Sequence, residues 1–135
     1  MNKLELMKTA NEIRKGIVTA VHSAKSGHPG GSLSAADIYT YLYFEELNID
    51  PEDPKKADRD RFVLSKGHTA PGLYSTLAHR GFFPVEDLTT LRHTDLYLQG
   101  HPDMKAHSGR GYVFRFFGTG NLRGSRNGNL RQTFQ

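Results

Sequence analysis

An abrupt change of composition at Ala106 limits what this chain can fold into. Residues 106–135 contain six glycines and five arginines but no aspartate or glutamate. They also lack a helical or alternating apolar pattern, so they cannot offset the entropy cost of becoming ordered. We therefore expect a folded part, residues 1–105, followed by a disordered basic tail, residues 106–135.

The folded part carries almost no net charge. The whole chain has a formal net charge of +4, but residues 1–105 hold 13 basic and 14 acidic residues, so the basic character belongs to the tail. The chain has no cysteine, which excludes disulfides and is typical of a reducing compartment such as the cytoplasm. Acids and lysines alternate at the amino terminus without an apolar run, so we expect neither a signal peptide nor a membrane span.

Apolar periodicity predicts mostly helices in the folded part. Apolar residues at helical spacing predict a first helix over residues 3–24. A second helix is predicted from near Ser34, a suitable N-cap, to about Leu47. Two shorter helices are predicted farther along, one ended by Gly81 and one over residues 84–92.

One short strand is predicted among these helices. The segment RFVLS, residues 61–65, is β-branched or aromatic and is bounded by charge and glycine. A single strand cannot form a sheet by itself. The predicted fold class is therefore α/β, as the incomplete front portion of a larger unit.

Three loops share one format, a histidine flanked by glycine and proline at the edge of a regular element. Glycine lets the backbone approach a ligand closely, and proline fixes the loop. A histidine on such a turn can donate to a phosphate or hydroxyl and can transfer protons near neutral pH. One loop alone is most simply a turn with an exposed imidazole, but three in one small chain indicate a shared pocket. They are called here the first (26–31, with His28), second (66–71, with His68) and third (99–103, with His101) histidine loops.

The segments KSGHPGGSLSAADI, DRFVLSKGHTAPGLYSTLAHRGFFP and LQGHPDMK together resemble the start of transketolases, in particular the split bacterial type with a separate amino-terminal subunit. The resemblance covers about residues 4–105. It implies a thiamine diphosphate-binding fold and transfer of a two-carbon ketol unit between sugar phosphates. It also implies thiamine diphosphate with Mg²⁺ or Ca²⁺ as cofactor. The implied partners are a homo-oligomer partner and a carboxy-terminal transketolase subunit, with no membrane and no nucleic acid.

The resemblance implies roles for the loop histidines. His28 and His101 would face the hydroxyls of the donor sugar and assist proton transfer. His68 would lie near the diphosphate of the cofactor and the reacting centre, and the implied cofactor-binding residues are His68 and Gly100. The Gly-Asp-Gly segment and the asparagine that hold the metal in the family do not occur after residue 105. We therefore assign no metal ligand, not even Asp103, and expect the chain to be a truncated fragment, inactive alone.

The tail has a hidden reading in another frame. The family continues after GHPDMK with a segment such as HIPGVDMSSGSLGQGI. When the codons from Ala106 to Asn121 are read one base late, the degenerate code permits this segment without interruption. Each single agreement means little, but an unbroken run is hard to attribute to chance. The sequence therefore predicts that the tail, residues 106–135, is a frameshifted translation.

A small nucleic-acid-binding module remains the alternative function. The tail interleaves aromatic residues with arginine and glycine, as RNA-binding segments do. This signal is compositional only. A salt-dependent shift on single-stranded RNA that vanished when the chain was cut at Lys105 would favour this alternative.

Overall fold

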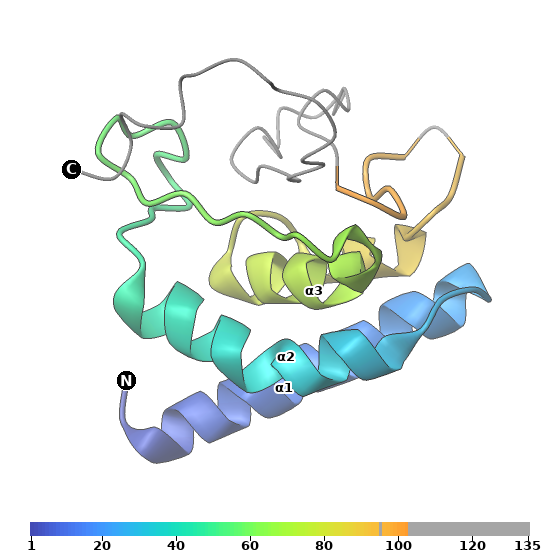
Figure 1. Ribbon diagram of the computed structural model, residues 1–135, viewed down its shortest axis with the longest axis horizontal. Helices are drawn as coiled ribbons and strands as arrows, with labels where there is room; N and C mark the ends of the chain where they lie inside the picture. Colours follow the sequence, from blue (N-terminus) through green and yellow to red (C-terminus); the bar gives the residue numbers. More distant parts are fainter. Residues whose placement is uncertain (95, 103–135) are drawn as a thin grey trace.

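The computed structural model describes residues 1–94 and 96–102, and the predicted disordered tail lies outside these residues. In Figure 1, helices α1 and α2 lie side by side and α3 lies over them. The described part of the chain is helical and contains no strand. Its α-helices are α1 (Lys3–Ala24), α2 (Pro29–Tyr41) and α3 (Ala70–Arg80), and its shorter helices are the π-helix η1 (Leu42–Glu46) and the 3₁₀-helices η2 (Gly67–Thr69) and η3 (Val85–Thr90).

Helix α1 confirms the prediction for residues 3–24. Its amino terminus has a capping box, in which the Asn2 side chain accepts from the Glu5 amide at 2.9 Å and the Glu5 carboxylate accepts from the Asn2 amide at 2.8 Å. Lys25 ends the helix in the left-handed conformation, with a φ of 48°. The buried residues recur at helical spacing and form one face: Ala10, Ile13, Gly16, Ile17 and Ala20.

Helix α2 begins earlier than predicted, at Pro29 rather than near Ser34. Proline is favoured in the first turn because its φ is already helical and its missing N–H needs no partner there. The glycines that indicated a loop belong to this first turn, where Gly31 packs closely on Thr69 of the second histidine loop. After Tyr41 the chain continues as η1 to Glu46, close to the predicted end.

The predicted strand over residues 61–65 is not a strand in the structure. The segment contains only an isolated bridge residue, Val63, because a strand needs a neighbour to pair with and the described residues supply none. Its apolar side chains pack on the helices instead. The Phe62 ring meets Tyr39 and Tyr43 edge-on, with centroids 5.8 and 5.7 Å apart. The described residues thus show the helices of the predicted α/β class but not its sheet.

Helix α3 forms the centre of the core. All residues from Ala70 to Ala78 are buried, because α1, α2 and η3 all pack against it. Gly81, with a φ of 97°, ends the helix as predicted. The helix predicted over residues 84–92 is instead the short η3. The hydroxyls of Thr89 and Thr90 bond to carbonyls three residues earlier, and such bonds compete with regular helix formation.

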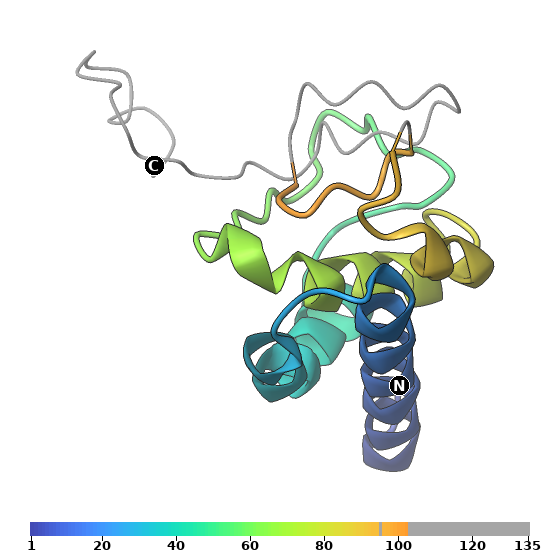
Figure 2. The same cartoon turned by 90° about the vertical axis from the view of Figure 1, so that its right-hand side faces the viewer.

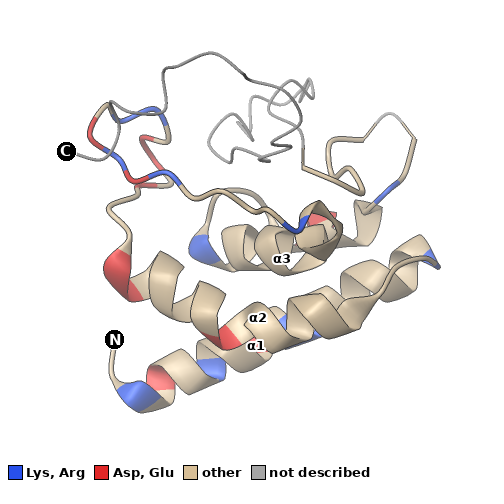
Figure 3. Cartoon of the chain, in the orientation of Figure 1, with Lys and Arg blue, Asp and Glu red and all other residues tan. Residues whose placement is uncertain are grey.

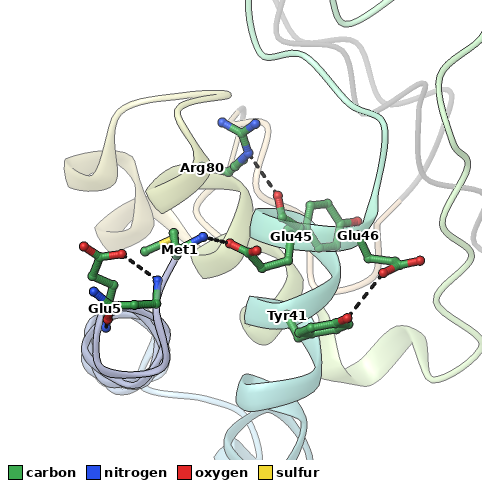
Figure 4. Close-up of polar contacts among 8 residues, drawn as sticks. Met1, Glu5, Tyr41, Glu45, Glu46 and Arg80 are labelled. Carbon is green, nitrogen blue, oxygen red and sulfur yellow. Dashed lines mark hydrogen bonds and ion pairs between the residues drawn. The ribbon is translucent and has the colours of Figure 1, made fainter.

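Polar contacts join the amino terminus and α3 to η1 (Figure 4). The Met1 amino group pairs with the Glu45 carboxylate, and Arg80 Nε donates to the Tyr43 carbonyl at 3.0 Å. Figure 3 shows residues of both charge signs along the segment between η1 and η2. Among the helices that the structure describes, none is both long and apolar enough to span a bilayer.

Candidate functional site

The first and second histidine loops are joined through the first turns of α2 and α3. Ser32 of α2 is buried, and its Oγ donates to the Thr69 carbonyl at 3.2 Å and accepts from the Gly72 amide at 3.1 Å. A Cβ on Gly31 would lie only 2.8 Å from the Thr69 side-chain methyl group. Only glycine permits this approach, so the amino-terminal ends of the two helices lie against each other.

The third histidine loop lies against the second. A Cβ on Gly67 would come within 2.7 Å of Cδ2 of His101, so this imidazole rests on the backbone next to His68. The Tyr74 hydroxyl anchors the third loop to α3 by donating to the Gln99 carbonyl at 2.9 Å. Burial raises the pKa of the Tyr74 phenol above its usual range, because the charged form would lose its hydration. Figures 1 and 2 show the orange segment that carries this loop above α3, on the side away from α1.

Arg92 connects the first and third histidine loops. Its Nη1 donates to Ser26 Oγ at 2.7 Å. A Cβ on Gly100 would lie 2.9 Å from its Nε, so the guanidinium passes directly along the third loop. The backbone of Arg92 is left-handed, with a φ of 62°, and its amide donates to the Leu98 carbonyl at 2.8 Å.

The structure thus brings together the three loops that the sequence predicts to share a site. The side chains of His28, His68 and His101 are all exposed. His101 lies on the second loop, whereas His28, the N-cap of α2, is connected to the others through its loop alone. No hydrogen bond joins two of these imidazoles in the described part of the chain.

Three residues that shape this site were not singled out from the sequence. Ser32 and Tyr74 lie in the motif segments, but a single sequence does not distinguish them from ordinary core positions. Arg92 follows a short helix and has no local pattern that indicates its role. Only long-range contacts reveal these residues, since each acts on a segment at least 25 positions away in the chain.

The arrangement is rich in hydrogen-bond donors. The first-turn amides of a helix have no intrahelical partner, and the positive end of its dipole favours anions. The space beside Gly30, in the first turn of α2, is open, since a Cβ there would meet no atom within 4 Å. With the histidines, these donors fit phosphate groups and sugar hydroxyls. They do not fit a metal ion, because the described residues contain no group of three or more potential ligands.

The sequence profile of the family described as transketolase, thiamine diphosphate binding domain, matches residues 6–118. The chain belongs to the transketolase family. The match spans all three histidine loops and confirms the resemblance seen in their sequences. It also runs past Lys105, so it does not mark the composition change at Ala106.

Curated relatives include subunits of split enzymes and single-chain enzymes. The chain is 44% identical over 103 residues to the 6-deoxy-6-sulfo-D-fructose transketolase subunit SqwG of Clostridium sp. (strain MSTE9), which covers 76% of this chain and 38% of that protein. It is 44% identical over 102 residues to one subunit of the apulose-4-phosphate transketolase of Phocaeicola vulgatus, covering 76% and 36%. Human transketolase is 44% identical over 101 residues, covering 74% and 16%.

The fold agrees with a solved structure. Transketolase from Leishmania mexicana superposes with a TM-score of 0.72 and 34% sequence identity, over 77% of this chain and 16% of that chain. The chain therefore spans less than two fifths of the relatives it matches. These relatives give no support to the nucleic-acid-binding alternative, whose arginine-rich tail lies outside the described residues.

Proposed function

We propose that this chain supplies the amino-terminal part of a transketolase site that moves a two-carbon ketol unit between sugar phosphates. The observation that carries the proposal is the convergence of the three histidine loops. They are far apart in sequence but meet through Ser32, Gly67 and Arg92. The family of the chain and the donor-rich character of this site both support the assignment.

The three histidines take different roles in this proposal. His28 and His101 face the hydroxyls of the donor sugar and assist proton transfer, as their exposure permits. His68, at the start of α3, lies near the diphosphate, together with Gly100. These positions use the ability of a histidine near neutral pH to act as both donor and acceptor.

Thiamine diphosphate is the cofactor proposed for this site, and it supplies the stabilised carbanion when it is bound. The exposed amides at the starts of α2 and α3 would hold anionic groups. The divalent metal, Mg²⁺ or Ca²⁺, takes its ligands from elsewhere in the assembly, because the described residues contain no group of potential ligands for it. This chain's own part is to orient the cofactor and the sugar and to move protons.

A second subunit completes the enzyme in our proposal. Two of the relatives are named as subunits of split transketolases. We propose two partners, a second copy of the assembly and a carboxy-terminal transketolase subunit, in the cytoplasm, where sugar phosphates are the substrates. The chain alone is then expected to have no turnover.

We also propose that residues 106–135 come from a shifted reading frame. The absence of acids after Asp103 and the recovered family segment support this. Sequencing of the gene tests it: the frame one base later should remain open and spell the family segment from codon 106 onwards. A stop codon or unrelated residues in that frame would contradict it.

The catalytic proposal is tested by reconstitution. The chain with its frame restored is mixed with the carboxy-terminal subunit, thiamine diphosphate and Mg²⁺, and ketol transfer from a ketose phosphate to an aldose phosphate is followed. We expect activity only when both subunits are present. Activity from one subunit without the other, or none from the mixture, would refute the proposal.

A further inference from the structure

We propose that Arg92 is a positioning residue that holds the first and third histidine loops at a fixed separation. Its catalytic consequence rests on the function proposed above, but the connection between the loops does not. The guanidinium bonds to Ser26 at 2.7 Å on one side and lies along Gly100 on the other. These contacts are close in sequence to His28 and His101.

The position of Arg92 is fixed at its backbone as well. Its amide donates to the Leu98 carbonyl at 2.8 Å, which closes the segment leading to the third loop. A φ of 62° is unfavourable for a residue with a side chain, and glycine would adopt it at lower cost. Strain of this kind persists where the side chain makes a compensating contribution. The bond to Ser26 is such a contribution, because it links two segments that are 66 positions apart in the chain.

The geometry of the guanidinium suits this role. Its planar group can donate to Ser26 while its face and edge follow the backbone at Gly100. The open space that a glycine leaves is required, since a Cβ on Gly100 would collide with Nε at 2.9 Å. Glutamine is too short to span the two loops, whereas lysine keeps the charge and much of the reach.

The connection is tested in the full chain by NMR order parameters of the Gly27 and Gly100 amides. Ser26→Ala removes only the acceptor in the first loop, on an exposed side chain, yet it should loosen Gly100 in the third loop. We expect order parameters to fall from about 0.85 towards about 0.6 at both glycines in Ser26→Ala and Arg92→Gln. Arg92→Lys should retain part of the order.

The same variants should change hydrogen exchange of the Arg92 amide. Loss of one hydrogen bond should accelerate exchange by about 2- to 10-fold. Arg14→Gln is the matched control: Arg14 pairs with Asp37 on the exposed faces of α1 and α2, so its loss should leave both loops unchanged. If Ser26→Ala leaves Gly100 as ordered as in the unmodified chain, the connection does not exist. This variant decides the question even if Arg92→Gln fails to fold.

The catalytic consequence is tested in the reconstituted enzyme. Misplacement of a histidine by about 1 Å can cost up to 10²-fold in rate, so Arg92→Gln should lower kcat by about 10- to 100-fold. The KM for thiamine diphosphate should not change, and Arg92→Lys should recover most of the rate. An unchanged kcat would overturn the positioning role. If the unmodified assembly is itself inactive, the proposed function fails, and the NMR result still decides whether Arg92 connects the loops.

Discussion

Replacement of Gly16 by alanine should destabilise the fold, although alanine is normally the better helix former. Gly16 lies on the buried face of α1, where a Cβ would lie 2.3 Å from Ser75 Oγ and 3.0 Å from Leu88 Cδ1. Ser75 cannot move freely, because its Oγ donates to the Ile13 carbonyl at 2.8 Å. The new methyl group must therefore separate the helices or break this bond.

The expected loss follows from three opposing effects. Overpacking of a tight core costs about 1–3 kcal/mol, and loss of the Ser75 bond costs about 1 kcal/mol more. Glycine to alanine within a helix gains about 1 kcal/mol. The net loss of unfolding free energy is about 1–3 kcal/mol, which lowers Tm by at least about 4 °C in a domain of this size.

Urea and thermal unfolding followed by circular dichroism at 222 nm measure this loss. Gly30→Ala is the matched control, since a Cβ there meets no atom within 4 Å; its stability should change by less than about 0.5 kcal/mol. In the double variant Gly16→Ala/Ser75→Ala the colliding hydroxyl is gone, so the two losses should not add. If Gly16→Ala is as stable as the unmodified chain, or the losses are strictly additive, the close packing of α1 on α3 is wrong.

Two further predictions concern the loops and the buried tyrosines. Gly67→Ala should displace the His101 ring, because its Cβ would lie 2.7 Å from Cδ2; the His101 imidazole resonances should shift, and unchanged resonances would contradict the contact. Burial raises the pKa of Tyr43 and Tyr74 above the usual range of tyrosine, whereas in the unfolded chain both ionise near pH 10. Since the folded chain binds these protons more tightly, their contribution is complete below about pH 10 and is lost as the pH rises above it. Stability should therefore fall between about pH 9 and 11, less steeply in Tyr74→Phe, and a flat profile would refute the burial of these phenols.

Local signals were sufficient for the first and last turns of some helices. The residues of α1 carry both apolar periodicity and a capping box, so the sequence alone predicted its bounds, Lys3–Ala24. Gly81 likewise predicted the end of α3. The start of α2 was missed because the glycines after Pro29 indicate a loop locally, and only contact with Thr69 makes them part of a helix.

Long-range contacts decided what local signals could not. Residues 61–65 have strand propensity, but strand formation requires a pairing partner that the described residues do not supply. The three histidines were recognisable from the format of their loops, whereas Arg92 was not, because its role depends on Ser26 across the fold. Chemically distinctive residues could thus be predicted, but the residues that arrange them could not.

The most direct test of the central claim compares turnover and stability when the loop histidines are removed. His28→Ala, His68→Ala and His101→Ala are made in the frame-restored chain and assayed with the carboxy-terminal subunit. His93→Ala is the control, since His93 is also exposed but lies outside the three loops. Loss of a proton-transfer or transition-state contact should lower kcat by about 10²-fold or more, while Tm stays within about 2 °C, because an exposed imidazole leaves no cavity. Unchanged turnover with a lowered Tm would show that these histidines serve the fold and not the reaction.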